Sequence, residues 1–193
     1  MRILNEDFYR RSAVEVAWDL PGKVLVHQTE EGVTSGMIVE AEAYYQGDPA
    51  CHATRGKTKR NAPMFGPPGR AYVYFIYGNH FCFNAVTGEE ERGEAVLVRA
   101  LEPLEGVELM WRRRGSDRPY RKLTGGPGNL CAALAITREQ NEASLLEPPL
   151  YIADTGKEVP SEEVVVTTRV GISRGEEELL RFYIKDNPHV SRR

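Results

Sequence analysis

The sequence AYVYFIYGNHFCFNAV at residues 71–86 predicts a β-hairpin. Both arms, Ala71–Ile76 and Phe81–Val86, are rich in aromatic and β-branched residues that favour strands, and the Gly78-Asn79 pair between them is typical of a tight turn. Tyr77 stands at the entrance to this turn, where a large side chain buries little against its own sheet. It either projects from the molecule or folds back onto the strands, and the pattern favours neither.

Further strands are predicted on both sides of this hairpin, at Lys23–Gln28, Ser35–Tyr45, Glu94–Ala100, Leu150–Ala153, Val164–Val170 and Leu180–Lys185. Helices are expected from Ser12 to Pro21, from near Pro103 to Gly115, and after Gly125–Asn129. We find no repeat and no linker. The pattern therefore predicts an α+β fold, with residues 1–193 as one mixed domain in which mostly antiparallel strands are flanked by helices and one hairpin protrudes.

Composition narrows the class of protein. The 193 residues are 41% hydrophobic, which is enough for a proper core. No stretch approaches the roughly 20 apolar residues that cross a bilayer, and the first residues lack the apolar centre of a signal peptide, so we expect a cytoplasmic protein. The cysteines Cys51, Cys82 and Cys131 are odd in number and widely spaced, so neither a disulfide framework nor a zinc site is expected.

The net charge of −3 alone argues against nucleic-acid binding, but the charges are unevenly distributed along the chain. Residues 49–88 contain no Asp or Glu, five basic residues and seven aromatic residues. Basic residues form two clusters, Arg55, Lys57, Lys59, Arg60 and Arg70, and then Arg112, Arg113, Arg114, Arg118, Arg121 and Lys122. On a shared face they would neutralise phosphates despite the overall charge; ordinary solvated charges are the alternative.

The segment VEAEAY at residues 39–44 carries candidate chemistry. Strand alternation places Glu40, Glu42 and Tyr44 on one face, where an acid could activate water and an aromatic ring could stack on a flat ligand. A solvent-facing edge strand is the alternative. Asp48 and His52 follow closely, and with the two glutamates they could in principle hold a metal, although the spacing matches no standard ligand motif.

The glycine-rich segment GGPG at residues 125–128 precedes a predicted helix. Backbone N–H groups at such a helix start can bind a phosphate. No Gly-Lys-Ser/Thr follows, so the segment is not a Walker motif, and a plain tight loop is the alternative.

Together these stretches resemble the alkyladenine (3-methyladenine) DNA glycosylase family, and its bacterial branch in particular. The matching stretches run in the same order along almost the whole chain and are GMIVEAEAY at 36–44, DPACH at 48–52, KRNAPMF at 59–65, YVYFIYG at 72–78, CFN at 82–84, VLVRALEPLEG at 96–106, GPGNLC at 126–131 and LRFY at 180–183. Asn79-His80 departs from relatives that often carry a longer apolar group such as Met there, and the stretch between Tyr44 and His52 is one residue shorter than in vertebrate members.

The resemblance implies a curved antiparallel sheet and a monofunctional enzyme of base-excision repair. Such an enzyme flips an alkylated or otherwise damaged purine out of double-stranded DNA and hydrolyses its N-glycosidic bond, leaving an abasic site. The substrates implied are 3-methyladenine and 7-methylguanine, with hypoxanthine and etheno-adenine as further possibilities. No cofactor, metal or membrane is expected, and the protein is expected to be a monomer associated with the bacterial nucleoid. Because no lysine in these motifs is placed as an amine nucleophile, lyase activity is not expected.

The resemblance also implies roles for individual residues. Glu42 is the general base, and Arg99 helps to hold the attacking water. In the base pocket, the flipped base is sandwiched by Tyr44, His52 and Tyr74. The fourth pocket residue, Asn84, disfavours normal guanine. Tyr77 inserts into the minor groove. Contacts to the DNA backbone are expected from Arg55, Lys57, Lys59, Arg60, Gly126, Gly128 and Asn129.

Two rival functions use the same residues. A non-catalytic nucleic-acid binding module would need only the basic and aromatic window. A metal-dependent nuclease or hydrolase would be built on Glu40, Glu42, Asp48 and His52.

Overall fold

Strand β3 (Gly32–Tyr44) organises the sheet. Along one edge it pairs with β6 (Glu94–Glu105), and along the other it pairs first with β2 (Val24–Thr29) and then with β9 (Arg181–Ile184). The register between β3 and β6 shifts around Glu40, where β3 changes from one partner to the next. Such bulges bend a strand and redirect its side chains.

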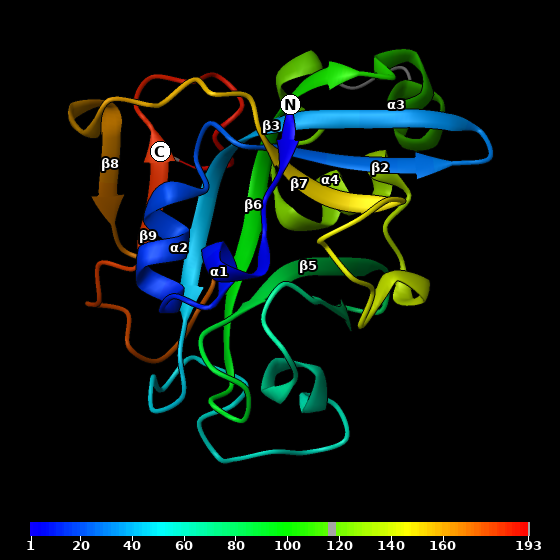
Figure 1. The fold of residues 1–193 in the computed structure, drawn as a ribbon. Coiled ribbons are helices and arrows are strands. Elements are labelled where there is room, and N and C mark those ends of the chain that lie inside the picture. Colours follow the sequence, from blue (N-terminus) through cyan, green and yellow to red (C-terminus); the bar gives the residue numbers. More distant parts are fainter. Residues whose placement is uncertain (116–118, 193) are drawn as a thin grey trace.

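The computed structural model describes residues 1–115 and 119–192, and within them nine strands form one sheet in the order β1-β7-β2-β3-β6-β5-β4, with β9 joining β3 to β8. Every pairing in it is antiparallel. The remaining strands are β1 (Arg2–Ile3), β4 (Ala71–Ile76), β5 (His80–Thr87), β7 (Leu150–Asp154) and β8 (Val164–Thr167). The direction of the strands turns strongly between β6 and β5 (Figure 1). The predicted α+β fold with a curved antiparallel sheet is confirmed.

Four α-helices flank this sheet in the described part of the chain: α1 (Glu6–Tyr9), α2 (Ala13–Asp19), α3 (Val107–Arg114) and α4 (Pro127–Leu134). Single 3-10 turns occur at η1 (Ala62–Phe65), η2 (Tyr120–Lys122), η3 (Arg138–Gln140) and η4 (Ser161–Glu163). The predicted capping box forms, because Ser12 and Glu15 bond each other's backbone N–H groups at the start of α2. None of the described helices is long and apolar enough to span a membrane.

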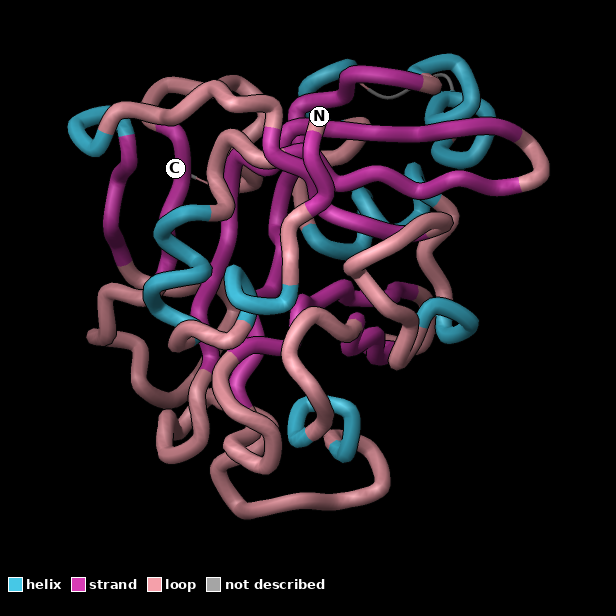
Figure 2. Tube along the Cα trace, viewed as in Figure 1, coloured by secondary structure: helices cyan, strands magenta, loops and turns pink. Residues whose placement is uncertain are grey.

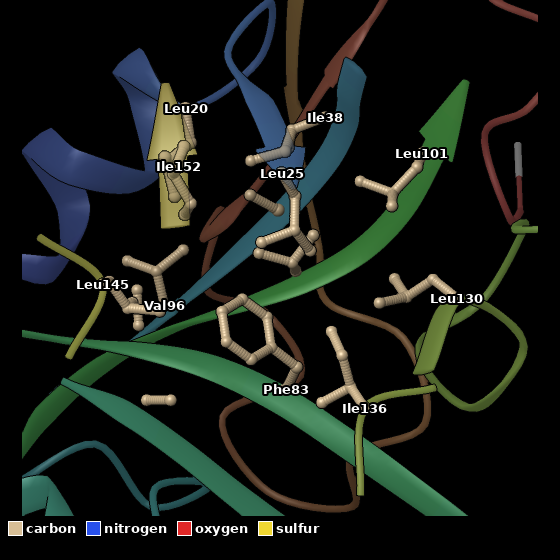
Figure 3. Packing of buried hydrophobic residues seen from close by; sticks show 14 of the residues in the cluster. Leu20, Leu25, Ile38, Phe83, Val96, Leu101, Leu130, Ile136, Leu145 and Ile152 are labelled. Carbon is tan, nitrogen blue, oxygen red and sulfur yellow. The ribbon is translucent and has the colours of Figure 1, made fainter. Parts of the chain in front are cut away.

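The main core lies between the sheet and helices α2 and α4. Figure 3 shows large aliphatic side chains converging there on the ring of Phe83, among them Leu25, Ile38, Leu101, Leu130 and Ile136. Each such side chain contributes about 1.5–3 kcal/mol when it is fully buried. A smaller cluster, which includes Cys51, Met64, Phe65 and Tyr72, packs the long 46–70 loop against the hairpin. Figure 2 shows this loop extending below the sheet, where β3 ends.

Several predicted boundaries were wrong, including the end of the strand predicted at Glu94–Ala100, which continues to Glu105. Pro103 does not start a helix but lies in β6 opposite Gly36, because β6 continues to pair with β3 to its end; the helix α3 begins only after Gly106, whose φ of 70° turns the chain. The strand predicted to end at Val170 already stops at Thr167, and residues 168–180 form a loop. Strand β3 begins at Gly32 rather than at Ser35, and the short elements β1 and α1 were not predicted.

Candidate active site

A cavity of about 530 Å³ opens where the hairpin, the end of β3 and two loops meet. Nine of the predicted site residues line it: Tyr44, His52, Tyr74, Tyr77, Asn84, Arg99, Gly126, Gly128 and Asn129. The predicted residues that do not line it are Glu42, Arg55, Lys57, Lys59 and Arg60. The fold thus brings together side chains from β3, β4, β5, β6 and the start of α4.

Glu42 lies immediately behind the cavity wall. Its side chain is fully buried, and its Oε2 accepts hydrogen bonds from the Tyr44 hydroxyl at 2.8 Å and from Arg99 Nη1 at 3.3 Å. Its Oε1 accepts the backbone N–H of Val170 at 2.7 Å. All three partners line the cavity. The carboxylate therefore does not line the cavity itself, and the residues that bond to it do. It lies on the same side of the sheet as Tyr44.

Burial dominates the protonation of this acid. It raises the pKa of the Glu42 carboxyl, and Arg99, the Val170 N–H and the Tyr44 hydroxyl oppose that rise in decreasing order. A carboxylate whose pKa is raised is a stronger base once it is ionised. The ionised Glu42 carboxylate is therefore a base that is shielded from bulk solvent.

Glu40 is a second buried carboxylate on the same face of β3. Its Oε1 accepts hydrogen bonds from Arg99 Nε at 3.3 Å and from Arg181 Nη1 at 2.8 Å, and its Oε2 accepts the Ser191 N–H at 2.7 Å. Arg99 thus bridges Glu40 and Glu42, and Glu40 fixes it from behind. The sheet pairs on both sides of β3, so the solvent-facing edge strand considered above is wrong for these residues.

Aromatic side chains form one side of the cavity. The rings of His52 and Tyr74 lie 4.7 Å apart and those of Tyr72 and Tyr74 lie 5.3 Å apart. The His52 Nδ1 is 3.0 Å from the Tyr72 hydroxyl, and burial, followed by the charge of Arg60, lowers the pKa of His52. The amide of Asn84 donates to the Tyr72 carbonyl at 3.0 Å. These contacts build a largely neutral wall suited to a flat ligand.

Tyr77 projects from the tip of the hairpin at the rim of the cavity. Its residue exposure is 81%, so it does not fold back onto the strands. Its φ of 55° lies in the left-handed region, which costs a non-glycine residue of order 1–3 kcal/mol. The tip therefore presents a bare aromatic side chain on a strained backbone.

The glycine-rich segment meets the hairpin on the other side of the cavity. A Cβ on Gly128 would lie 2.8 Å from the His80 ring, so only glycine fits this contact. The Asn129 amide donates to the Gly125 carbonyl at 2.6 Å and shapes the start of α4. The loop is thus a cavity wall at a helix start rather than an isolated tight turn.

The two basic clusters differ in placement. Arg55, Lys57, Lys59 and Arg60 are all exposed on the 46–70 loop, and Arg60 lies 5.7 Å from the Tyr74 ring centroid. Members of the second cluster serve the fold instead: Arg113 binds Glu31 at 2.7 Å, and Arg114 donates to Asn129 at 2.6 Å. Arg118 lies outside the described residues.

Comparison with known proteins places this arrangement in a family. A model of the methylpurine-DNA glycosylase family matches residues 7–188. A relative from Methanoculleus marisnigri is 55% identical over 188 residues, which cover 96% of this chain and 97% of the relative. Another from Carboxydothermus hydrogenoformans is 48% identical over 191 residues, which cover 99% and 100% respectively. Both carry the words 3-methyladenine DNA glycosylase in their names.

The chain belongs to the methylpurine-DNA glycosylase family. It is a DNA glycosylase for alkylated bases in base-excision repair, and DNA is its partner. The non-catalytic binding module considered above is therefore wrong as a description of this protein.

The carboxylates of the glycosylase are held by arginines rather than gathered as a ligand set. Glu40 and Glu42 share Arg99, and Asp48 is paired with Arg169. In the described part of the chain, no three His, Cys, Asp or Glu side chains come together in a way that could hold a metal ion. The ligand set assumed for a metal-dependent nuclease therefore does not assemble.

The sequence did not indicate one part of the candidate site. Residues 170–174 line the cavity and supply the Val170 N–H to Glu42, and Arg169 binds Asp48 beneath them. This segment was predicted in part as a strand, and no short motif marks it. A buried aspartate needs a cationic partner, but the sequence shows neither that Asp48 is buried nor where in the chain its partner lies.

Proposed function

We propose that this glycosylase extrudes an alkylated purine, of the 3-methyladenine or 7-methylguanine type, from duplex DNA into the cavity and hydrolyses its N-glycosidic bond. The observation that carries the proposal is the buried Glu42 carboxylate, whose three hydrogen-bond partners all line the cavity. Hypoxanthine and etheno-adenine are further candidate substrates, because the aromatic wall is equally suited to a neutral flat base.

In the proposed reaction, a water molecule held near Arg99 attacks C1′ of the deoxyribose while the bond to the purine nitrogen breaks. The electron pair of that bond leaves with the base, which neutralises the positive charge of an alkylated purine. Glu42 accepts a proton from the water, and its negative charge stabilises the developing oxocarbenium sugar. The product is an abasic site. No amine nucleophile takes part, so no covalent intermediate forms.

Extrusion of the base is supported by the aromatic walls. Stacking contributes about 1–3 kcal/mol per base, which offsets part of the cost of unstacking. We assign Tyr44, His52 and Tyr74 to the sandwich around the base, because all three line the same cavity. A damaged base that pairs poorly costs less to extrude, which adds selectivity.

Two further residues have separate roles, one in selecting the base and one in filling the space that the base leaves in the duplex. Asn84 stands in the cavity wall with its amide fixed on a backbone carbonyl, so it can crowd the exocyclic amine of normal guanine. Tyr77, exposed at the hairpin tip, is placed to fill the space that the extruded nucleotide leaves. Arg55, Lys57, Lys59 and Arg60 are assigned to the DNA backbone, together with the start of α4 at Gly126, Gly128 and Asn129.

We also propose that residues 1–193 act as one catalytic domain and as a monomer, because the cavity walls come from a single chain. If this is right, the released base in an active-site titration will correspond to one site per chain, and sedimentation at working concentration will give a mass near 21.7 kDa.

The test uses duplex DNA that carries one alkylated purine, incubated with the protein in EDTA. We expect free base and an abasic strand in the presence of chelator, and a rate lowered by about 1,000-fold or more in Glu42→Gln. Borohydride should trap no protein–DNA adduct. Loss of release in EDTA, or strand scission without free base, would overturn the proposal.

A further inference from the structure

Arg169 lies beneath the Tyr44 side of the cavity without lining it. We propose that Arg169 is a positioning residue that holds three segments of the cavity wall in one arrangement. Its guanidinium joins the end of β3, the start of the 46–70 loop and the 168–180 loop. The inference rests on the proposed function, because it takes the cavity as the place of the extruded base.

The first segment is the end of β3. The Arg169 Nη1 donates to the Ala43 carbonyl at 3.0 Å, and the guanidinium carbon lies 4.7 Å from the centroid of the Tyr44 ring. Tyr44 lines the cavity and Arg169 does not, so the guanidinium covers the ring from the protein side. A cation over an aromatic face is attracted by the ring. This contact sets the plane on which a base would stack.

The second segment is the beginning of the 46–70 loop. Both carboxylate oxygens of Asp48 accept hydrogen bonds from Arg169, with Nη2 at 2.8 Å from Oδ1. The same Oδ1 accepts the Ala50 N–H at 2.9 Å, and Ala50 lines the cavity two residues before His52. The ion pair therefore fixes the point from which the histidine wall begins.

The third segment is the loop that contains Arg169 itself. The next residue, Val170, gives its N–H to Glu42, and the Gly175 carbonyl accepts a hydrogen bond from Arg169 Nη2 at 3.4 Å. Gly175 has a φ of 60°, and a Cβ there would lie 3.3 Å from Arg169 Nη2 and from Asp48 Oδ1. The cavity-lining residues 170–174 thus lie between Arg169 itself and Gly175, whose carbonyl the Arg169 guanidinium binds.

Only an arginine fits this position. The planar fork supplies two terminal nitrogens in fixed directions and a flat face for the tyrosine ring, whereas a lysine offers one point charge. The side chains of Arg169 and Asp48 are both fully buried, so their geometry is set by each other and not by solvent. Asp48 adds a negative charge to the positive one, which leaves the pair neutral overall.

The experiment measures single-turnover release of base from a duplex with one 7-methylguanine, at saturating protein, for the wild type, Arg169→Lys and Arg113→Lys. Arg169→Lys keeps the charge that a buried Asp48 requires but removes the fork. Arg113→Lys is the matched control, because Arg113 also binds a carboxylate and a carbonyl, of Glu31 and Ala133, but lies outside the cavity wall. Thermal unfolding is measured on the same samples, and Asp48→Asn serves as the second variant if Arg169→Lys fails to fold.

We expect Arg169→Lys to lower the single-turnover rate by about 100-fold, the scale expected for a misplacement of about 1 Å. The amplitude should stay close to that of the wild type, and Arg113→Lys should keep the wild-type rate. A purely structural role would lower the amplitude and the melting temperature but leave the rate of the folded molecules unchanged, and that result would overturn the inference. If the wild type itself releases no base, the proposed function fails instead. If Asp48→Asn is the variant measured, a lower rate at unchanged amplitude again supports the inference, and a lower amplitude at unchanged rate again overturns it.

Discussion

Two regions border the same cavity and are built in opposite ways. Behind the wall, Glu40 and Glu42 are fully buried and tied to arginines and backbone N–H groups. At the rim, Tyr77 is 81% exposed on a strained backbone. The buried region is organised by the protein alone, whereas the tip can gain its contacts only from a partner. The difference teaches that the side chains proposed for the chemistry are held in place by the protein itself, whereas the side chain proposed to enter DNA is not.

The largest expected effect tests the buried region. Glu40→Gln removes a charge that faces both Arg99 and Arg181, and breaking a buried pair in this way costs about 3–5 kcal/mol. Urea unfolding should show this loss. Glu31→Gln is the control, because Glu31 pairs with Arg113 at the surface and such pairs contribute about 0–1 kcal/mol. Equal losses for the two variants would contradict the comparison.

The next effect tests the rim. Tyr77→Ala should weaken binding to a damaged duplex by about 5- to 150-fold, because one stacking contact contributes about 1–3 kcal/mol. The free energy of unfolding should change by less than about 0.5 kcal/mol, as for other exposed sites. The matched control is Phe75→Ala on the same hairpin, a half-exposed ring that packs on Phe81 at 5.0 Å and does not line the cavity. Unchanged binding by Tyr77→Ala would show that the tip does not enter DNA.

The pH dependence sharpens the role of the buried acid. Because burial raises the pKa of Glu42, its base form is present above that pKa and is lost as the pH falls through it. The single-turnover rate should fall about tenfold per pH unit below the midpoint, and the midpoint should lie above the ordinary glutamate value of about 4.3. Circular dichroism at each pH checks that the fold persists. A rate that stays constant down to pH 4 would rule out Glu42 as the base.

The smallest effect separates the two basic clusters. Arg60→Ala should remove about one phosphate contact. The slope of log K against log salt for DNA binding should therefore become shallower by about 0.9. Arg112→Ala, an exposed change on α3, should leave the slope unchanged; Figure 1 shows α3 at the opposite end of the molecule from the 46–70 loop. Binding titrations between 50 and 200 mM salt measure both, and a larger change in slope for Arg112→Ala would reverse the assignment.

Local sequence signals predicted much of the fold. The hairpin at 71–86, the capped helix after Ser12 and the alternation at 39–44 all depend on neighbours within a few residues, and all formed as expected. Pro103 misled because strand pairing over a distance overrode its preference for a helix start. The edges of β8 and β3 were also misplaced, since hydrophobic runs do not end where pairing ends.

The site was predictable only where a family motif carried it. Tyr44, Tyr74, Asn84 and Arg99, which the resemblance singled out, line one cavity, and the roles it gives them stay predictions. The contacts of Glu42 with Val170 and of Asp48 with Arg169 join residues more than 100 positions apart, and no spacing in the sequence encodes them. The burial of Glu42 behind the wall likewise depends on both strands that pair with β3.

Alternate residues of strand β3 face the apolar core and the candidate active site. Ala41 and Ala43 belong to the main core, while Glu40 and Glu42 face Arg99 on the opposite side. Deleting or inserting one residue in this strand would exchange the two sets, bringing charged groups into the apolar core and methyl groups to the side that faces Arg99. Length changes here should therefore be tolerated far less well than point substitutions, because they would unfold the chain and inactivate it in the same step.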